Sequence, residues 1–217
     1  MGGGRILIHW RVALNGNSVI EPLLKSFLGP TAAAVWQMIE RDLDADFFEK
    51  WQAVAGSQLE APAFSTNKRK QEWAAGRRAL LNLHEVLQSA GIAPAARIFS
   101  LSHSGEMVLA VACEKSAQVK KIGVDIESAD RVLTTQVAEK FVDREEQQWG
   151  LSALQLWTIK EAAFKANPKS EDTYVSQYIL KDWDANKQRG CVSCGSTELR
   201  VQVWQEGAFM GAFASAK

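Results

Sequence analysis

The feature that most constrains this chain is a short apolar strand that carries two carboxylates, the segment IGVDIE at 122–127. Successive side chains on a strand point to opposite faces, so Asp125 and Glu127 stand side by side on the face opposite to Val124. Acidic residues are uncommon in strands, and like charges about 7 Å apart repel each other. The segment is therefore either a strand with one water-exposed face or part of a cation-binding site.

The composition is that of a soluble globular protein, with 217 residues of which 47% are hydrophobic. Its 25 basic side chains balance its 25 acidic ones, which argues against nucleic acid as the main partner. No apolar run reaches the roughly 18 residues of a membrane span, and His9 and Arg11 interrupt the apolar N-terminal stretch. We therefore expect a cytoplasmic protein without a signal peptide or a membrane segment.

The three cysteines, Cys113, Cys191 and Cys194, do not suit a disulfide framework. The last two have the spacing of half a zinc knuckle, but a structural zinc ion needs four ligands, and only Cys113 and three histidines remain. We expect a hairpin turn with incidental thiols there.

Hydrophobic periodicity predicts a mixed α+β fold. The expected elements are strands at 5–14, 98–101 and 107–113, helices at 21–55 (broken at Gly29-Pro30), 68–89 and 152–166, a helical region from Thr134 to Gly150, and a final hairpin around Gly207. In the first helix a stripe recurs at spacings of three and four and predicts core positions at Trp36, Ile39, Leu43, Phe47 and Trp51. Expected helix caps are Thr66 or Asn67, Ser152, and the box formed by Asp143 and Glu146.

The chain contains a weak internal repeat. Residues 68–113 run from a basic helix into a hairpin, and residues 144–214 run from a charged helix into a hairpin. This repetition predicts two similar α+β halves, 1–120 and 121–217, with a ligand cleft between them.

The helix at 152–166 has charged residues on what looks like its apolar stripe. At about 100° per residue, Trp157, Glu161 and Lys165 share one side, while Ile159 lies on the far side. Glu161 and Lys165 could be an ordinary pair four residues apart, worth about 0.2 to 0.5 kcal/mol. Alternatively, Glu161 binds a divalent cation, while Lys165 and Lys160 bind phosphate oxygens.

Basic residues open the helix at 68–89, where the helix dipole makes each cation unfavourable by about 0.3 to 1 kcal/mol. A bound anion would make the cations favourable at this helix end, although a solvated basic turn is the simpler interpretation. Arg77 lies on the same helix, and Ser102 and His103 in SLSHSG are further donors for phosphate. Together with the acids, these groups predict a magnesium and diphosphate site, without a choice between transfer and hydrolysis.

These residues resemble the 4'-phosphopantetheinyl transferase superfamily. Its two most specific motifs correspond to GVDIE at 123–127 and WTIKEAAFK at 157–165, and FSLSHSG and the basic segment 68–77 correspond to two looser motifs in the same order. The length is similar to that of the surfactin-synthetase-activating branch, in which one monomeric chain forms a pseudo-dimer of two halves. The first sixty and the last fifty residues carry no diagnostic motif.

The resemblance implies that the protein moves the phosphopantetheine arm of coenzyme A to a serine of an apo carrier protein and releases adenosine 3',5'-bisphosphate. The carrier would belong to a fatty-acid, polyketide or peptide synthase. Magnesium would be held by Asp125, Glu127 (directly or through a water) and Glu161, with Glu161 as acceptor of the serine proton.

The resemblance also assigns the cations. Lys165 and Lys160 would neutralise the diphosphate, and Ser102 and His103 would contact phosphates of coenzyme A. Lys68 and Arg77 would bind its 3'-phosphate, with Arg69, Lys70 and Arg78 as substitutes. Two alternatives stay open: a magnesium-dependent nucleotide-diphosphate hydrolase, and a silent module that binds coenzyme A or a carrier.

Overall fold

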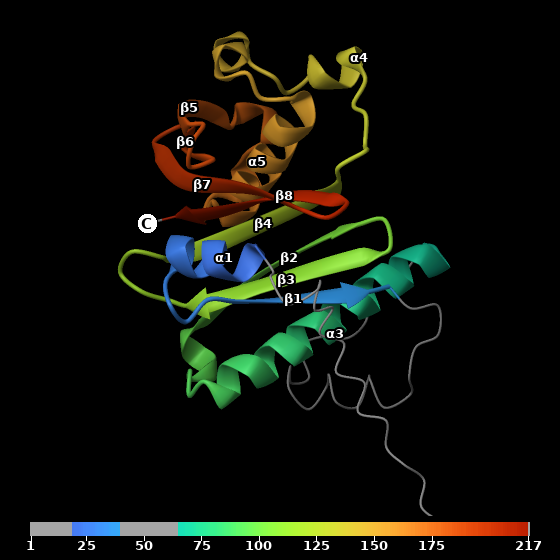
Figure 1. Cartoon of the computed structure of the whole chain (residues 1–217), viewed down its shortest axis with the longest axis vertical. Helices are drawn as coiled ribbons and strands as arrows, with labels where there is room; N and C mark the ends of the chain where they lie inside the picture. Colours follow the sequence, from blue (N-terminus) through green and yellow to red (C-terminus); the bar gives the residue numbers. More distant parts are fainter. Residues whose placement is uncertain (1–18, 40–64, 217) are drawn as a thin grey trace, which may run out of the picture.

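The computed structural model describes residues 19–39 and 65–216, which form two antiparallel sheets between two long helices (Figure 1). The first sheet has the order β1-β3-β2 and the second has the order β4-β8-β7-β6-β5. The strands are β1 (Ala33–Met38), β2 (Arg97–Ser104), β3 (Met107–Glu114), β4 (Lys121–Ser128), β5 (Ile179–Asp184), β6 (Arg189–Cys194), β7 (Thr197–Glu206) and β8 (Phe209–Ala216). The helices are α1 (Ile20–Leu28), α3 (Asn67–Ser89), α4 (Thr135–Ala138) and α5 (Ala153–Ala166), with short 3-10 turns η1 (Pro94–Ala96), η2 (Arg144–Trp149), η3 (Ser170–Asp172) and η4 (Val175–Gln177). The fold is mixed α+β, as the sequence predicts.

From bottom to top in Figure 1, the layers are α3, the first sheet, the second sheet and α5. Alternate residues of β3 divide the core: Val108 and Ala110 pack in the cluster under α3, while Leu109 and Val111 pack with Val124 between the sheets. This period of two is what a strand buried on both faces requires.

Three serines join the two sheets. The hydroxyls of Ser100, Ser102 and Ser104 on β2 accept hydrogen bonds from the backbone N–H groups of β4, with donors at Val124 (2.9 Å), Ile126 (3.3 Å) and Ser128 (3.1 Å). Each pair has the same separation of 24 residues, so β2 and β4 run in the same direction. Both are edge strands of their own sheets, and a buried edge N–H without a partner is costly. We call this set of three hydrogen bonds the serine ladder.

Helix α5 lies unusually close to β4. A Cβ atom at Gly123 would lie 2.0 Å from the carbonyl oxygen of Ala162 and 2.7 Å from the nitrogen of Ala166. Only glycine permits this approach of two backbones. The small residues of α5 thus bring the helix, and the side chains next to them, directly against the acidic strand.

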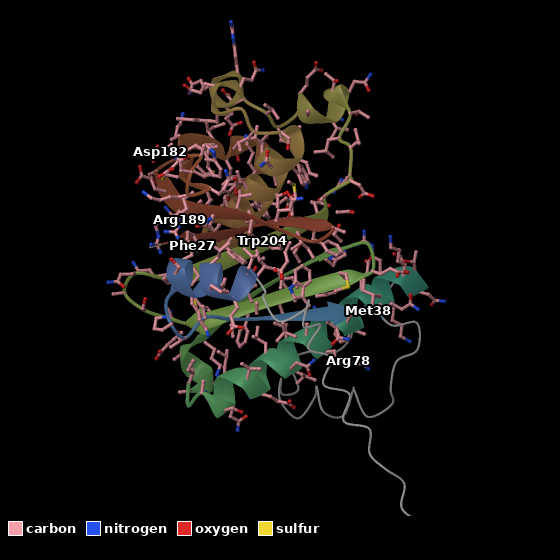
Figure 2. All side chains as sticks on the ribbon, viewed as in Figure 1. Phe27, Met38, Arg78, Asp182, Arg189 and Trp204 are labelled. Carbon is pink, nitrogen blue, oxygen red and sulfur yellow. The ribbon has the colours of Figure 1, made fainter. Side chains whose placement is uncertain are left out.

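Helix α1 connects the two sheets from the side. Its buried face packs with Trp36 of β1 and Trp204 of β7, whose ring centroids are 5.9 Å apart. From the second sheet, Arg189 donates to Ser26 over 2.9 Å, and the Arg200 guanidinium lies 5.3 Å from the centre of the Phe27 ring. Figure 2 shows Phe27 and Arg189 near each other, at the end of α1 that faces the second sheet.

Most of the expected elements after residue 65 are present. Thr66 caps α3 by accepting from the Arg69 N–H, and Gly91 follows the helix at a φ of 77°. The expected capping box of Asp143 and Glu146 is confirmed at η2, and Ser152 caps α5 as expected, there in a box with Gln155. The final hairpin, β7 and β8, turns at Gly207 as expected.

The expectation of a helix through 21–55 is wrong at 33–38. These residues form β1, which pairs antiparallel with β3, and Trp36 packs on Trp204 and Phe209 instead of lining a helix stripe. Pairing with a neighbouring strand outweighed the short helical pattern, because both backbone and side chains are satisfied in the sheet. Residues 21–28 of the expected helix do lie in α1, so that part of the prediction is confirmed. Residues 40–55 of it and the strand expected at 5–14 lie outside the described residues.

The sequence also gave no sign of β5 and β6. Cys191 and Cys194 lie within β6 and not in a turn, and Cys194 is buried in the core. Lys181 and Asp182 are adjacent and both exposed on β5, an edge strand whose register shifts at this point, so the sequence lacks the alternation of a strand there. None of the helices in the described ranges combines the length and the apolar character that a bilayer crossing requires.

The close approach at Gly123 makes a prediction for stability. Gly123→Ala places a methyl group on the backbone of α5, so we expect the free energy of unfolding to fall by roughly 1 to 3 kcal/mol or more. Gly76→Ala is the matched control, because its added Cβ would meet Leu101 at an ordinary 3.5 Å inside a helix. Urea unfolding of both variants measures the difference, and an unperturbed Gly123→Ala would contradict the packing described.

A second prediction concerns pH. Arg97 is buried and donates to Nδ1 of His84 over 2.8 Å, so this histidine must be neutral. Burial, and then the charge of Arg97, lower the pKa of His84 below its ordinary 6.5. The unfolded chain therefore takes up the proton first, and stability is lost as the pH falls through about 6.5. In urea unfolding at pH 7.5 and 5.5, we expect a larger loss for the wild type than for His84→Gln; equal losses would refute this.

Candidate active site

Asp125 is the centre of the candidate site. It lies on β4 with 6% of its surface exposed, and its Oδ1 accepts hydrogen bonds from Lys165 Nζ and Ser102 Oγ, each over 2.8 Å. Its Oδ2 is buried and, among the described residues, has no hydrogen-bond partner. Burial raises the pKa of Asp125, while Lys165 and Ser102 oppose this rise. A buried carboxylate with one unsatisfied oxygen is costly unless something binds it.

Glu161 and Lys165 come from α5, one turn apart. Lys165 donates to the carbonyl oxygen of Val124 over 3.0 Å in addition to Asp125, which fixes its ammonium on the strand. The pKa of Glu161 is raised, first by burial and then by the negative charge of Asp125, with a smaller contribution from Glu127. The three carboxylates therefore lie within electrostatic range of one another, as the sequence predicts.

Glu127 is held by donors from three elements. Its Oε1 accepts from the Trp157 indole N–H over 3.1 Å and from Arg131, and its Oε2 accepts from Ser104 over 3.3 Å. The Trp157 ring is in turn held edge-on against Phe141, with ring centroids 5.0 Å apart. In this arrangement Glu127 is turned toward Arg131 and Trp157.

A pocket of about 320 Å³ opens beside Glu127, between the two sheets' edges. Its lining residues are Lys68, Glu72, His103, Ser104, Gly105, Glu127 and Arg131. Three of the expected site residues, Lys68, His103 and Glu127, are thus brought together from three separate elements. His103 lies on β2 and not in a turn, because the strand continues to Ser104.

Glu72, Ser104, Gly105 and Arg131 line the pocket although they were not expected as site residues. Glu72 lies 3.7 Å from Lys68 and 3.6 Å from His103, measured between charged atoms. The sequence feature that could have revealed Glu72 is its spacing of four residues from Lys68 on one helix. Arg131 has the same spacing from Glu127. The signal of Ser104 is the alternation of serines along β2, which gives one strand face three hydroxyls.

Arg77 is not among the residues that line this pocket. Its guanidinium lies 4.8 Å from the centre of the Trp73 ring, and burial lowers its pKa from the ordinary value. The basic segment at the start of α3 is therefore divided, with Lys68 at the pocket and Arg77 stacked two turns further along.

Lys160 is not brought to the carboxylates of β4. It is fully buried, and its ammonium lies 2.7 Å from Glu146 and donates to the carbonyl oxygen of Phe141 over 2.6 Å. Glu146 also accepts from the backbone N–H groups of Leu180 and Asp143, each over 2.8 Å. This buried ion pair fastens η2 to α5 and β5. Neutralisation of a diphosphate by Lys160 therefore does not fit the structure.

The helix stripe inferred from the sequence also needs correction. Ile159 and Ala163, placed on the far side, are completely buried, whereas Trp157, Glu161 and Lys165 are only half-buried. Helix α5 is covered by the second sheet on one side and by the segment around Phe141 on another. The side that carries Glu161 is the more open one, which is why charged residues are tolerated there.

A metal ion has no preformed site of three histidine, cysteine or acidic side chains within residues 19–39 and 65–216. Magnesium, however, usually takes one or two carboxylates, with water and substrate phosphates completing its shell. The unsatisfied Oδ2 of Asp125 and the raised pKa of Glu161 fit such a two-carboxylate site.

The thiol of Cys113 is buried with a pKa raised to about 12, and is inert.

The comparison with protein families agrees with this geometry. Residues 121–206 match the 4'-phosphopantetheinyl transferase superfamily. The matched segment contains β4 with its two acids and α5 with Glu161 and Lys165. The superfamily link thus covers the carboxylates and Lys165, whereas Lys68, Ser102 and His103 lie outside the match. A search of curated proteins finds no match to the chain.

The Lys160 ion pair provides a testable distinction. Lys160→Met leaves the Glu146 carboxylate buried without its counter-ion, so we expect a loss of roughly 3 to 5 kcal/mol in the free energy of unfolding. Adding Glu146→Gln removes that charge but keeps an acceptor for the Leu180 N–H, so the double variant should recover part of the loss. Urea unfolding measures both, and a double variant that adds the two losses would argue against a buried pair.

Proposed function

We propose that this protein transfers the 4'-phosphopantetheine arm of coenzyme A to a serine of an apo acyl or peptidyl carrier protein, leaving holo carrier and adenosine 3',5'-bisphosphate. The observation that carries the proposal is the buried Asp125, with one oxygen held by Lys165 and Ser102 and the other unsatisfied, beside Glu161. Asp125, Glu161 and Lys165 lie in the segment that matches the superfamily of phosphopantetheinyl transferases, whereas Ser102 lies outside it.

Glu161 is suited to accept the proton of the carrier serine. Glu161 is half-buried within electrostatic range of Asp125, and in this proposal it accepts the proton directly or through a metal-bound water. In the proposed step the serine oxygen attacks the phosphorus that bears the pantetheine arm, and the serine proton passes to a Glu161 carboxylate oxygen. The bond from that phosphorus to the bridging oxygen breaks, and the electron pair leaves with adenosine 3',5'-bisphosphate.

Lys165 supplies a fixed positive charge next to the carboxylates. Because its ammonium is anchored to Val124 and Asp125 from the strand side, its third hydrogen is available for a phosphate oxygen. Such a preorganised charge stabilises the negative charge that develops on the transferring phosphoryl group. Magnesium, held by Asp125 and Glu161, would neutralise the diphosphate.

The pocket beside Glu127 is the proposed place for a phosphate of coenzyme A. It presents three basic side chains, Lys68, His103 and Arg131, from both parts of the chain. In this proposal the chain works as two halves, 1–120 and 121–217, as in the surfactin-synthetase-activating branch. Each half contributes a sheet with a helix on its outer face, in support of that division (Figure 1).

Neutral substitutions of similar shape test the proposal. Asp125→Asn and Glu161→Gln keep the side-chain volume but remove the charges, so we expect transfer to fall by at least about 100-fold. Glu145→Gln, an exposed acid on η2, is the control and should transfer normally. The assay is the mass gain of a panel of apo carriers from fatty-acid, polyketide and peptide synthases with coenzyme A and magnesium, alongside thermal unfolding.

The same assay separates the alternatives. Normal transfer by either site variant would refute the roles given to Asp125 and Glu161. A nucleotide product that appears without any carrier, combined with no mass gain on any carrier, would favour a hydrolase instead.

A further inference from the structure

We propose that Ser102 is a positioning residue that orients the Asp125 carboxylate, and not a ligand of a coenzyme A phosphate. The inference rests on the proposed function, since it concerns how Asp125 is prepared for the cation and the diphosphate. It departs from what the family resemblance implies for this serine. Asp125 lies in the second sheet and Ser102 in the first, so the orientation of this carboxylate depends on a side chain of the other sheet.

The Ser102 hydroxyl is fully used within the protein. Only 3% of the residue surface is exposed, and the hydroxyl donates to Asp125 Oδ1 over 2.8 Å while accepting from the Ile126 N–H over 3.3 Å. A hydroxyl has one hydrogen to donate, and an ionised phosphate oxygen can only accept. Contact with a phosphate would therefore require the bond to Asp125 to break and leave that buried carboxylate with less support.

The bond selects which carboxylate oxygen is available. Ser102 and Lys165 both occupy Oδ1, so Oδ2 is the oxygen left without a partner among the described residues. Ser102 thus adds a second bond to Oδ1 beside that of Lys165, and the two bonds together keep the carboxylate from rotating. Groups that hydrogen-bond a metal-binding carboxylate in this way typically change metal affinity or activity by 10- to 100-fold.

The serine ladder fixes Ser102 itself. Its neighbours at two residues before and after, Ser100 and Ser104, make the same bond to β4 at the same separation of 24 residues. Ser102 therefore cannot shift along β4 without disturbing all three bonds. Ser100 makes the ladder bond to Val124 and, within the part of the chain that the structure describes, no hydrogen bond to an acid, which makes it the matched control.

The experiment compares Ser102→Ala with Ser100→Ala in the full chain. We measure manganese binding by electron paramagnetic resonance, with and without coenzyme A, and the kcat and KM for coenzyme A with a carrier that the wild type modifies. For Ser102→Ala we expect manganese affinity to fall about tenfold or more and kcat to fall about 10- to 100-fold, with KM for coenzyme A within about twofold. Ser100→Ala should leave all three unchanged, because it removes a ladder bond and no bond to a carboxylate.

Two outcomes would overturn the proposal. If Ser102→Ala raises the KM for coenzyme A with manganese affinity unchanged, Ser102 contacts the phosphate directly. If Ser100→Ala and Ser102→Ala lose affinity and kcat equally, the ladder acts on the fold and not on Asp125. Ser102→Cys, which keeps the size and only a weak donor, replaces Ser102→Ala if that variant does not fold, with the same readouts.

Failure of the proposed function has a different signature. If the wild type modifies no carrier, phosphopantetheine transfer is refuted, but the manganese titration still tests the Ser102 bond. Equal manganese affinity of wild type and Ser102→Ala would refute the positioning role whatever the reaction is.

Discussion

The serine ladder is the interaction on which the rest of the structure depends. Strand β4 ends its sheet, so its outward N–H groups have no strand to pair with, yet they are buried or half-buried against β2. An unpaired buried N–H costs about 1 to 3 kcal/mol, and three hydroxyls at a period of two satisfy three in a row. The ladder closes the sheet edge and sets the register in which the two sheets meet. It thereby brings basic groups of one sheet to acids of the other.

The site combines groups that would be unfavourable if separate. Two carboxylates on one strand face repel each other, and burial adds to the cost, so each needs its own set of donors. Asp125 has Ser102 and Lys165, while Glu127 has Trp157, Arg131 and Ser104. Gly123 lets α5 approach closely enough for its side chains to reach the strand. The acidic strand, the glycine and the helix therefore act as one unit, which agrees with their occurrence together in the matched segment.

Local signals were predictable from the sequence. Helix caps, the hairpin turn at Gly207 and the acidic strand depend on neighbours within a few residues, and these were found in the described residues. The hairpin turn expected at Cys191 and Cys194 was not, because both lie in β6. Strand β1 was misjudged because its six residues gain their stability from β3, some seventy residues away. Lys160 and Lys165 were both predicted to bind the diphosphate. Two side chains five residues apart, however, point about 140° apart around the helix axis. One points to Glu146 and the other to Asp125.

The sequence by itself determined the chemistry available: carboxylates on one strand, a glutamate and a lysine one turn apart on one helix, and a basic helix start. These follow from residue type and from the periods of 2 and 3.6, which need no knowledge of distant partners. Only the tertiary structure decided which charged side chains face the pocket and which form ion pairs inside the core. In the structure Lys160 pairs with Glu146, Ser102 donates to Asp125, and Arg131 pairs with Glu127. The physical reason is that burial and partner identity depend on contacts between residues far apart in the chain.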